Sequence, residues 1–550
     1  MNIKITASAG KFLNLIIRLL KKYYFILTPL MIYVSFPFSE IDSNGILSVF
    51  AWISLVPIIV YMRNKNYRQS WKAVLFISLL SNLITFGWMR EFGAQIQYGT
   101  VIVLIVLIPA ISVFTFTKFI LMESLRKRFP HLSVLIYPGI WVLIDFIQSI
   151  GYLAFPWVYW SYTQYQFDSF IQIASITGVF GISWIMITFN ILLAETIMNF
   201  KNKKTGRIYL TGLAVYIFFI ILVIFWGHNR IINFNEKQKS TVSKNTLKVA
   251  FVQSCISPFE NWYQNRFRYL DDLIHYSKLA LNEQPDTELI LWTESSALET
   301  ITYNYERGIC NEFENAVIDF AAENKVNLYT GEIGRIDNYS KMRIQFQNSA
   351  VLIDHNGKID GNYSKIHLCP FGEWFPYGNW MNWFDDVIVE LGGAAFVPGK
   401  EEKLFNVDDK KFGALICYES LFFRQNRDYR NMGADFLVLI TNDGWTDYFK
   451  GHMQHFPASK FRAVENGIYF LRAGNTGFTA VINPLGIVEK SIPILKQGFL
   501  TDEINTDLKI ETFYTKHGDI LYYIAELLFI IILTFNYLYI NIFSAKEKLK

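Results

Sequence analysis

Eight apolar stretches constrain the fold of this 550-residue chain more than any other feature. A helix needs about 20 apolar residues to cross the hydrocarbon core of a bilayer, and each stretch is close to that length. Seven precede a long polar region at 228–519, and one follows it: 24–38, 46–62, 73–89, 101–122, 132–149, 170–197, 208–227 and 520–542. The first is the weakest, because it is short and contains Pro29. The sequence therefore predicts an α-helical transmembrane bundle of eight spans.

Lys and Arg alternate strictly between the predicted loops. They cluster in the N-terminal segment, in the loops 63–72, 124–131 and 199–207, and in the C-terminal tail, whereas the loops 39–45, 92–100 and 150–169 contain none. Cytoplasmic loops of membrane proteins are enriched in Lys and Arg. We therefore expect both termini in the cytoplasm and 228–519 outside. A signal peptide is the alternative for the N-terminal segment, but no small-residue cleavage site follows it.

Composition agrees with a membrane protein and excludes one class of partner. Hydrophobic residues make up 52% and charged residues 18% of the chain. The net charge of +4 and the lack of a basic stripe give no reason to expect nucleic acid. Asp145 and Glu526 lie inside predicted spans, where ionisable groups usually face the bundle interior. A helix–helix hydrogen bond and a lipid or substrate contact are both open for each.

The polar region has the pattern of an α/β domain. We expect a polar linker at 228–246 and then short strands alternating with helices, which is typical of a layered sheet core. The strands are expected at 247–253, 288–292, 326–331, 348–353, 412–417, 435–441 and 478–482, and the helices near 262–282, 311–324, 420–431 and 452–466. The predicted division is 1–227 for seven spans, 228–519 for the extracytoplasmic domain, and 520–550 for the eighth span with a cytoplasmic tail.

Four cysteines lie in this domain, at 255, 310, 369 and 417. An extracytoplasmic location permits two disulfide bridges, while the spacings match no zinc pattern, so we expect no metal. Cys417 differs from the others because it ends an apolar strand (KFGALIC) and precedes a helical run. A strand-to-helix turn projects its side chain from the sheet edge, where a nucleophile needs to be. Cys417 by itself remains open to a buried structural role.

Two further segments favour the catalytic reading of Cys417. LILWTES (289–295) places Glu294 directly after a strand, and NYSKIHLCPFGEWFPYG (362–378) places Lys365 and Glu373 in an aromatic, proline-rich loop. Apolar surroundings desolvate a lysine and strengthen its charge at short range. A solvated strand-end glutamate and a surface lysine are the alternatives when each segment is taken singly.

The three segments together, in the order Glu, Lys, Cys, resemble the nitrilase superfamily. With the predicted spans, the chain is similar to the membrane branch of that superfamily, the apolipoprotein N-acyltransferases. GYLAFPWVYWSYTQY (151–165), ITGVFGISW (176–184), VQSCISPFENW (252–262) and TNDGWTD (441–447) resemble further motifs of that branch. Two positions depart from it: Thr293 stands where proline is usual, and Cys369 where an aliphatic residue is usual. Thr293 leaves the backbone at Glu294 less constrained than proline would.

This resemblance implies a nitrilase-like αββα sandwich and a catalytic triad of Glu294, Lys365 and Cys417. It implies an acyltransferase of the bacterial inner membrane that needs no cofactor. The enzyme would move an acyl chain from a phospholipid, through a Cys417 thioester, to the α-amino group of a diacylglyceryl-cysteine on an apolipoprotein. The residues implied to line the substrate pocket are Glu373, Tyr418, Glu419, Trp262 and Trp445. Core packing or membrane anchoring is the alternative for the two tryptophans, and a glycine-rich stretch at 391–399 is either a lid or a surface loop.

Other classes of function remain open from the sequence. A membrane-anchored amidase would use the same triad with water as acceptor, but one helix would suffice to anchor it. A catalytically inactive lipid-binding scaffold would not need all three triad residues. A transporter would not need so large a domain between its last two spans.

Overall fold

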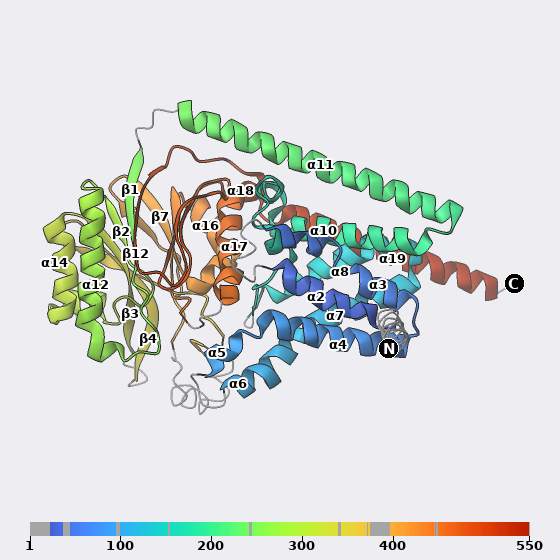
Figure 1. Ribbon diagram of the computed structural model, residues 1–550, viewed down its shortest axis with the longest axis horizontal. Helices are drawn as coiled ribbons and strands as arrows, with labels where there is room; N and C mark the ends of the chain where they lie inside the picture. The colour runs from blue at the N-terminus through green and yellow to red at the C-terminus, as the bar shows by residue number, and fades with distance from the viewer. Residues whose placement is uncertain are drawn as a thin grey trace, which may run out of the picture.

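The computed structural model describes residues 22–36, 45–94, 99–151, 154–240, 245–338, 343–370, 372–374, 396–444, 446 and 449–548. It has two parts along one axis, a helical bundle and a domain of two sheets (Figure 1). The domain is inserted between the last two long helices of the bundle, α11 (Lys203–Ser240) and α19 (Ile520–Lys548).

Each predicted span contains helix, but only some of these helices are long and apolar enough to cross a membrane. Within the described residues, six segments meet that description by length and composition: Ile46–Arg63, Val103–Arg128, Pro130–Gln148, Ala174–Asn199, Lys203–Ser240 and Ile520–Tyr539. The helix at Tyr24–Ser35 is apolar but shorter. Helix α4 (Tyr67–Phe86) has 20 residues and begins with the polar run YRQSWK. A membrane-spanning bundle is therefore present, while the count of eight spans stays a prediction.

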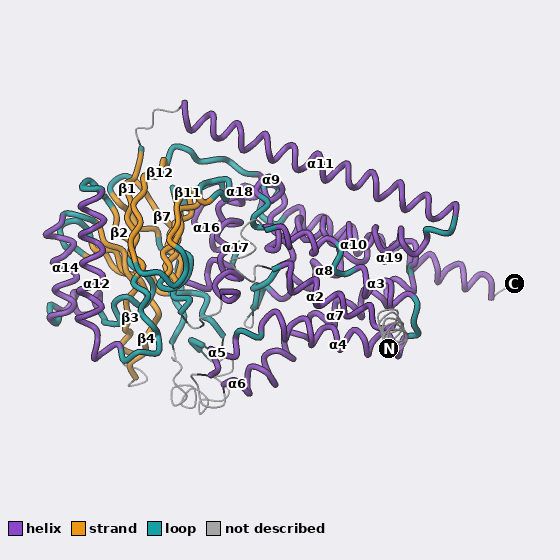
Figure 2. The backbone as a smooth tube through the Cα atoms, viewed as in Figure 1, coloured by secondary structure: helices purple, strands orange, loops and turns teal. Residues whose placement is uncertain are grey.

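Besides α4, α11 and α19, the α-helices of the bundle range from four residues in α6 to 26 in α10, and turns of 3-10 or π geometry join several of them. The α-helices are α2 (Leu27–Ser35), α3 (Val56–Arg63), α5 (Met89–Ala94), α6 (Gly99–Ile102), α7 (Ile108–Arg128), α8 (Ser133–Gln148), α9 (Asp168–Ile171) and α10 (Ala174–Asn199). The shorter turns are η1 (Tyr24–Ile26), η3 (Ile46–Trp52), η4 (Val103–Leu107), η5 (Pro130–Leu132) and η6 (Trp160–Gln164). The α10–α11 turn lies at the end of the bundle far from the sheets (Figure 2).

The sequence predicted a polar linker at 228–246. This prediction is wrong for most of the segment, because residues up to Ser240 are helical. Helix α11 continues through Ser240, so its 38 residues extend over roughly 57 Å at 1.5 Å per residue, well beyond a bilayer core of about 30 Å. The residues Glu236–Lys239 are good helix formers. Phe234 also packs against Leu485 and Leu508 of the domain. The helix therefore carries the chain from the bundle directly to the first strand, and the three-part division of the chain stays a prediction.

The two ionisable residues inside predicted spans differ in their surroundings. Asp145 on α8 pairs with Lys118 on α7, with Oδ1 and Nζ 2.5 Å apart, so a helix–helix hydrogen bond is confirmed there. Glu526 on α19 is buried, and neither of its carboxylate oxygens has a hydrogen-bond partner among the described residues.

The domain is an αββα sandwich, as expected. One sheet has the order β12-β1-β2-β3-β4-β5 and the other β11-β10-β9-β8-β7-β6. The strands are β1 (Thr246–Gln253), β2 (Leu289–Leu291), β3 (Asn327–Asn338), β4 (Arg343–Ile353), β5 (Ile359–Ser364), β6 (Leu404–Val407), β7 (Lys410–Ile416), β8 (Phe436–Thr441), β9 (Tyr469–Gly474), β10 (Thr479–Ile482), β11 (Val488–Ile492) and β12 (Gly498–Asn505). All seven predicted strands are confirmed, and β5, β6, β9, β11 and β12 were not predicted.

The two helix layers face different surroundings. Helices α12 (Trp262–Glu283) and α14 (Glu312–Asn324) cover the outer sheet, and α16 (Phe423–Asn431) and α17 (Phe449–Asn466) lie between the inner sheet and the bundle (Figure 1). All four were predicted within a few residues. The remaining elements are α13 (Ile301–Arg307), η7 (Cys417–Leu421) and α18 (Phe513–His517).

Parallel pairing at the centre of each sheet brings strand ends together. In the outer sheet β1, β2 and β3 run parallel, and in the inner sheet β7, β8 and β9 do so. Residues buried between the sheets, such as Phe251, Leu291, Phe412 and Ile440, form the core of the sandwich. The carboxyl ends of parallel strands therefore meet at one edge within each sheet, and a hydrogen bond from Asn442 after β8 to Glu294 after β2 joins the two sheets there.

Candidate active site

The predicted triad residues each follow a strand. Glu294 lies three residues after β2 ends at Leu291, Lys365 follows the end of β5, and Cys417 follows the end of β7. Glu294 and Lys365 are both almost fully buried. The structure brings Glu294 and Lys365 together, with Oε1 and Nζ 3.6 Å apart.

A second glutamate and an asparagine complete a polar cluster around the lysine. Glu373 Oε1 lies 2.8 Å from Lys365 Nζ. Asn348 Nδ2 donates to Glu294 Oε1 at 2.7 Å and to Glu373 Oε1 at 2.6 Å. The backbone N–H of Asn442 donates to Glu294 Oε2 at 2.6 Å. Both carboxylates are therefore fixed by more than one partner.

Burial and charge set the protonation of this cluster. Burial raises the pKa of Glu294, and although Lys365 opposes this, the net direction is upward. Burial lowers the pKa of Lys365, but Glu373 and Glu294 outweigh burial and hold that pKa well above its ordinary value. Burial and then Glu294 raise the pKa of the Cys417 thiol, with Lys365 opposing them. The resting thiol is therefore protonated and requires a base, and the buried glutamate suits that task.

The nucleophile candidate occupies a strained turn. Cys417 has a φ of 51°, in the left-handed region that residues with a Cβ rarely adopt. Glu419 supports this turn: Oε2 accepts from the Ile416 N–H at 2.8 Å, and Oε1 accepts from the Ile366 N–H at 2.7 Å. Tyr363 also donates its hydroxyl to Glu419 Oε1 at 2.7 Å. One buried carboxylate thus ties the cysteine turn to the lysine loop.

The unusual Thr293 is held by hydrogen bonds where proline would be held by its ring. Its backbone N–H donates to Ser296 Oγ at 3.1 Å, and its own hydroxyl lies 3.0 Å from the same oxygen. Gly331 on β3 lies so close that a Cβ there would come within 2.7 Å of the Ser295 nitrogen. The turn that presents Glu294 is therefore fixed from two sides.

The structure separates the predicted pocket residues. Glu373 joins the cluster, and Tyr418 donates its hydroxyl to the Ala154 carbonyl at 3.0 Å, which connects the nucleophile turn to a loop of the membrane bundle. Trp262 instead packs against Phe313 beneath the outer helices, with ring centroids 5.4 Å apart. Trp445 and residues 391–395 of the glycine-rich stretch lie outside the described residues.

The four cysteines are all free, so the two-bridge alternative is wrong. Cys369 lies in the lysine loop, where its backbone N–H donates to Glu373 Oε2 at 2.6 Å, and burial raises the pKa of its thiol to about 12. Cys255 and Cys310 lie at separate places in the fold, after β1 and before α14.

Sequence reasoning missed a second polar group beneath Cys417. His455 Nε2 lies 2.9 Å from Ser420 Oγ and 3.1 Å from the Cys417 carbonyl oxygen, and its Nδ1 lies 2.8 Å from Asp443 Oδ1. Arg472 donates to Asp443 Oδ2 at 2.6 Å. Although burial opposes it, the charges of Arg472 and His455 hold the pKa of Asp443 well below its ordinary value. Asp443 lies in the quoted segment TNDGWTD, whereas no local pattern singles out His455 on its helix.

Comparisons with known proteins found a separate family model for each of the two parts of the chain. A carbon-nitrogen hydrolase family model matches residues 248–511, and a model of the apolipoprotein N-acyltransferase N-terminal domain matches residues 30–192. Apolipoprotein N-acyltransferases from Borreliella burgdorferi and Geobacter metallireducens are each 27% identical to it, over 90% of this chain and 91% of theirs. Apolipoprotein N-acyltransferase 1 of Treponema denticola is 25% identical, over 91% of this chain and 93% of its own.

The fold and the matched models define a membrane protein with a catalytic domain of the carbon-nitrogen hydrolase class. Within that class, the chain is similar over about nine-tenths of its length to apolipoprotein N-acyltransferases, and its helical part matches the N-terminal model of that family.

Proposed function

We propose that this protein transfers an acyl chain from a membrane phospholipid to the α-amino group of the diacylglyceryl-cysteine that begins an apolipoprotein. The observation that carries this proposal is the contact of the nucleophile turn with the membrane bundle. Tyr418, next to Cys417, bonds to Ala154 in the loop after α8. A site at this junction receives lipids from the bilayer, whereas a soluble amide would need no such bundle.

In the first half-reaction, Cys417 attacks the phospholipid ester. Glu294 takes the thiol proton as the Cys417 sulfur bonds to the ester carbon, and then returns a proton to the oxygen of the departing lysophospholipid. Lys365 stabilises the thiolate and the oxyanion of the tetrahedral intermediate. Because the pKa of the Cys417 thiol is raised, the thiol needs Glu294 to remove its proton.

In the second half-reaction, the α-amine of the acceptor attacks the thioester. Glu294 takes the amine proton, the carbon–sulfur bond breaks, and Cys417 recovers its proton. An α-amino group has a pKa near ~8 and a lysine side chain one near ~10.4, so an N-terminal amine is more often neutral and reactive.

The surrounding residues divide into two roles. Asn348 and Glu373 orient Glu294 and Lys365 through the hydrogen bonds that join them. Glu419 is a positioning residue, because its oxygens bind backbone N–H groups of two loops and it is fully buried. Tyr418 supports the turn from the side of the bundle. The alternation of basic loops supports a place in the bacterial inner membrane with this domain on the outer side.

Intact-protein mass measured after incubation with phospholipid tests the proposal. We expect wild type to gain one acyl mass, and neutral hydroxylamine or a diacylated lipopeptide to remove it, the lipopeptide becoming triacylated. Cys417→Ala and Glu294→Gln should each lose the adduct. Cys310→Ser is the matched control, because Cys310 lies outside the cluster, and it should behave as wild type.

Two outcomes contradict the proposal. An adduct of equal size on Cys417→Ala would place the acyl group elsewhere. Release of free fatty acid with no acylation of the lipopeptide would favour a hydrolase that uses water as acceptor.

A further inference from the structure

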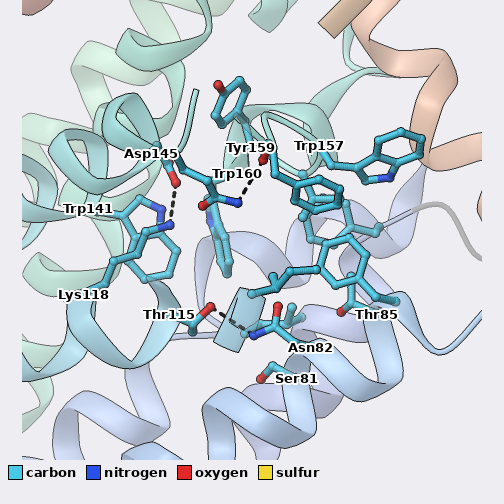
Figure 3. Close-up of a pocket in the computed structure, with 17 residues that line it drawn as sticks. Ser81, Asn82, Thr85, Thr115, Lys118, Trp141, Asp145, Trp157, Tyr159 and Trp160 are labelled. Carbon is cyan, nitrogen blue, oxygen red and sulfur yellow. Dashed lines mark hydrogen bonds and ion pairs between the residues drawn. The ribbon is translucent and has the colours of Figure 1, made fainter. Parts of the chain in front are cut away.

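A small cavity lined by both polar and apolar side chains lies inside the membrane bundle, beside the catalytic domain. It encloses about 60 Å³ among α2, α4, α7, α8 and the loop 154–160. The ion pair between Lys118 and Asp145 lies on its wall, with Lys118 Nζ 4.5 Å from the centre of the Trp141 ring (Figure 3). Neither residue belongs to the proposed chemistry.

Several polar atoms on the wall of this cavity have no hydrogen-bond partner within the described part of the chain. They are Asp145 Oδ2, Ser81 Oγ, Thr85 Oγ1 and Trp157 Nε1, and each is buried. Inside a membrane, a polar atom without a hydrogen-bond partner costs on the order of several kcal/mol of free energy. The reason is the same as in a protein core, where water is also absent. The set contains acceptors and donors, so its ligand must offer both.

The size of the cavity selects the ligand. A cavity must offer about 10–15 Å³ to hold one water molecule. The cavity volume of about 60 Å³ therefore suits a cluster of a few waters. An acyl chain would be longer and would leave the carboxylate oxygen and the hydroxyls unpaired. Water is the ligand that satisfies both the volume and the polar atoms.

Trp157 on the wall of this cavity contacts two residues at the nucleophile turn. Trp157 stacks on Tyr418 with ring centroids 6.0 Å apart, and on His455 with centroids 5.4 Å apart. His455 in turn lies 3.1 Å from the Cys417 carbonyl oxygen. Phe155 stacks behind Trp157 at 6.0 Å. In Figure 3 Trp157 lies on the side of the cavity nearest the ribbon of the catalytic domain.

We propose that the cavity holds water and that Trp157 is the barrier that keeps this water from the Cys417 thioester. This inference rests on the proposed function. Without the barrier, water attacks the thioester carbon, the carbon–sulfur bond breaks, the fatty acid leaves, and a proton from the water returns to the Cys417 sulfur. Trp157 thus determines that the acceptor is an amine rather than water.

The test follows the lifetime of the acyl-enzyme after phospholipid has been removed, by intact mass, in water enriched in ¹⁸O. In Trp157→Ala we expect the thioester to decay at least about tenfold faster than in wild type, a lowering of the barrier by ~1.4 kcal/mol, with ¹⁸O in the released fatty acid. Trp157→Leu is a second, less disruptive variant and should accelerate decay in the same direction. Trp157→Phe should stay near wild type.

The matched control removes a neighbouring indole that does not form the barrier. Trp88 lies 6.0 Å from Trp157 and donates to Gln454 at 3.0 Å, but it is not among the described residues that line the cavity. Trp88→Ala should therefore leave the lifetime of the thioester unchanged. Equal acceleration in Trp88→Ala and Trp157→Ala would indicate general loosening and overturn the proposal.

A second arm tests the source of the water. Replacing the ion pair with Lys118→Met and Asp145→Leu removes both charges and the unpaired Asp145 oxygen from the cavity wall, and such replacements are often tolerated. Added to Trp157→Ala, they should return the decay toward the wild-type rate. Unchanged decay in both Trp157→Ala and Trp157→Leu, or rapid decay that persists after the ion pair is removed, would overturn the inference. A wild-type protein that forms no acyl-enzyme would instead overturn the proposed function on which it rests.

Discussion

The two helix layers of the sandwich occupy equivalent places on opposite sheets, but they are built differently. Only five of the 22 residues of α12 are buried: Tyr269, Leu270, Leu273, Ser277 and Ala280. In α17 every residue from Lys450 to Asn466 is buried. The outer helix faces solvent, whereas the inner helix is enclosed between a sheet and the membrane bundle (Figure 1). The same fold position therefore imposes opposite demands on polar side chains.

Helix α17 meets this demand by pairing several of its charged groups, some within the helix and some with the bundle. Arg462 lies 2.8 Å from Glu465, whose Oε1 accepts from the Val179 N–H in the bundle at 3.0 Å. Lys460 pairs with Asp168 of the bundle at 2.8 Å. On α12, by contrast, Arg268 pairs with Glu260 of the preceding loop, and both side chains are at least half exposed. The inner helix layer therefore links the membrane bundle to the sheet that carries the active site.

The largest expected difference comes from removing one arginine from each layer. Arg462→Met leaves Glu465 as a buried, unpaired carboxylate, which should cost about 3–5 kcal/mol of stability. Arg268→Met removes an exposed pair, which contributes little to stability, so its Tm should stay near that of wild type. Thermal unfolding of both variants in detergent, followed by intrinsic fluorescence, measures the contrast. Equal shifts in Tm would mean that the inner layer is not more tightly coupled than the outer.

A buried carboxylate of the outer sheet, Glu332, should make the stability of this layer depend on pH. Glu332 on β3 accepts from the Thr302 N–H and hydroxyl, both at 2.8 Å, and from Asn362. These donors are neutral, and burial raises the pKa of Glu332 to about 7. Because the folded state keeps this proton longer than the unfolded state, stability falls as pH rises from about 4.5 through about 7, by roughly 3 kcal/mol in total.

Glu332→Gln should remove this dependence. We expect the Tm of wild type to fall relative to that of the variant between pH 5 and pH 8, measured on the two proteins side by side. Glu323→Gln, an exposed change on α14, is the control and should follow wild type. Parallel Tm profiles for Glu332→Gln and wild type would contradict the raised pKa.

Sequence patterns predicted those helices and strands that depend mainly on interactions between residues close together in the chain. The apolar runs and the seven strands each follow from the periodicity of a short stretch, whereas the orientation inferred from the basic loops stays a prediction. The proximity of Glu294 and Lys365 was implied only by the resemblance, because β5, the strand that Lys365 follows, was not predicted. The resemblance supplied the pairing of segments that no single stretch could justify.

What remained hidden depends on contacts between distant segments. His455 on α17 has no distinctive neighbours in sequence, yet burial against the nucleophile turn gives it a place in the site. The helical continuation of α11 to Ser240 depends on Phe234 packing against Leu485 and Leu508, more than 200 residues away in sequence. Span count is also not fixed by the sequence, because α4 joins an apolar stretch to the mostly exposed polar run YRQSWK at its start.

The smallest expected effect probes whether the outer layer acts only on stability. Asn311 caps α14: its Oδ1 accepts from the Glu314 N–H at 3.0 Å, and Glu314 Oε2 accepts from the Asn311 N–H at 2.8 Å. Asn311→Ala should lower the free energy of unfolding by about 1 kcal/mol, while Asn311→Ser, which retains a capping oxygen, should lose less. Because α14 lies on the far side of the sandwich from the bundle, neither change should alter the rate of lipopeptide triacylation measured well below the Tm. A loss of that rate in Asn311→Ala would show that the outer helices also hold the site, and that only their exposure distinguishes them from α17.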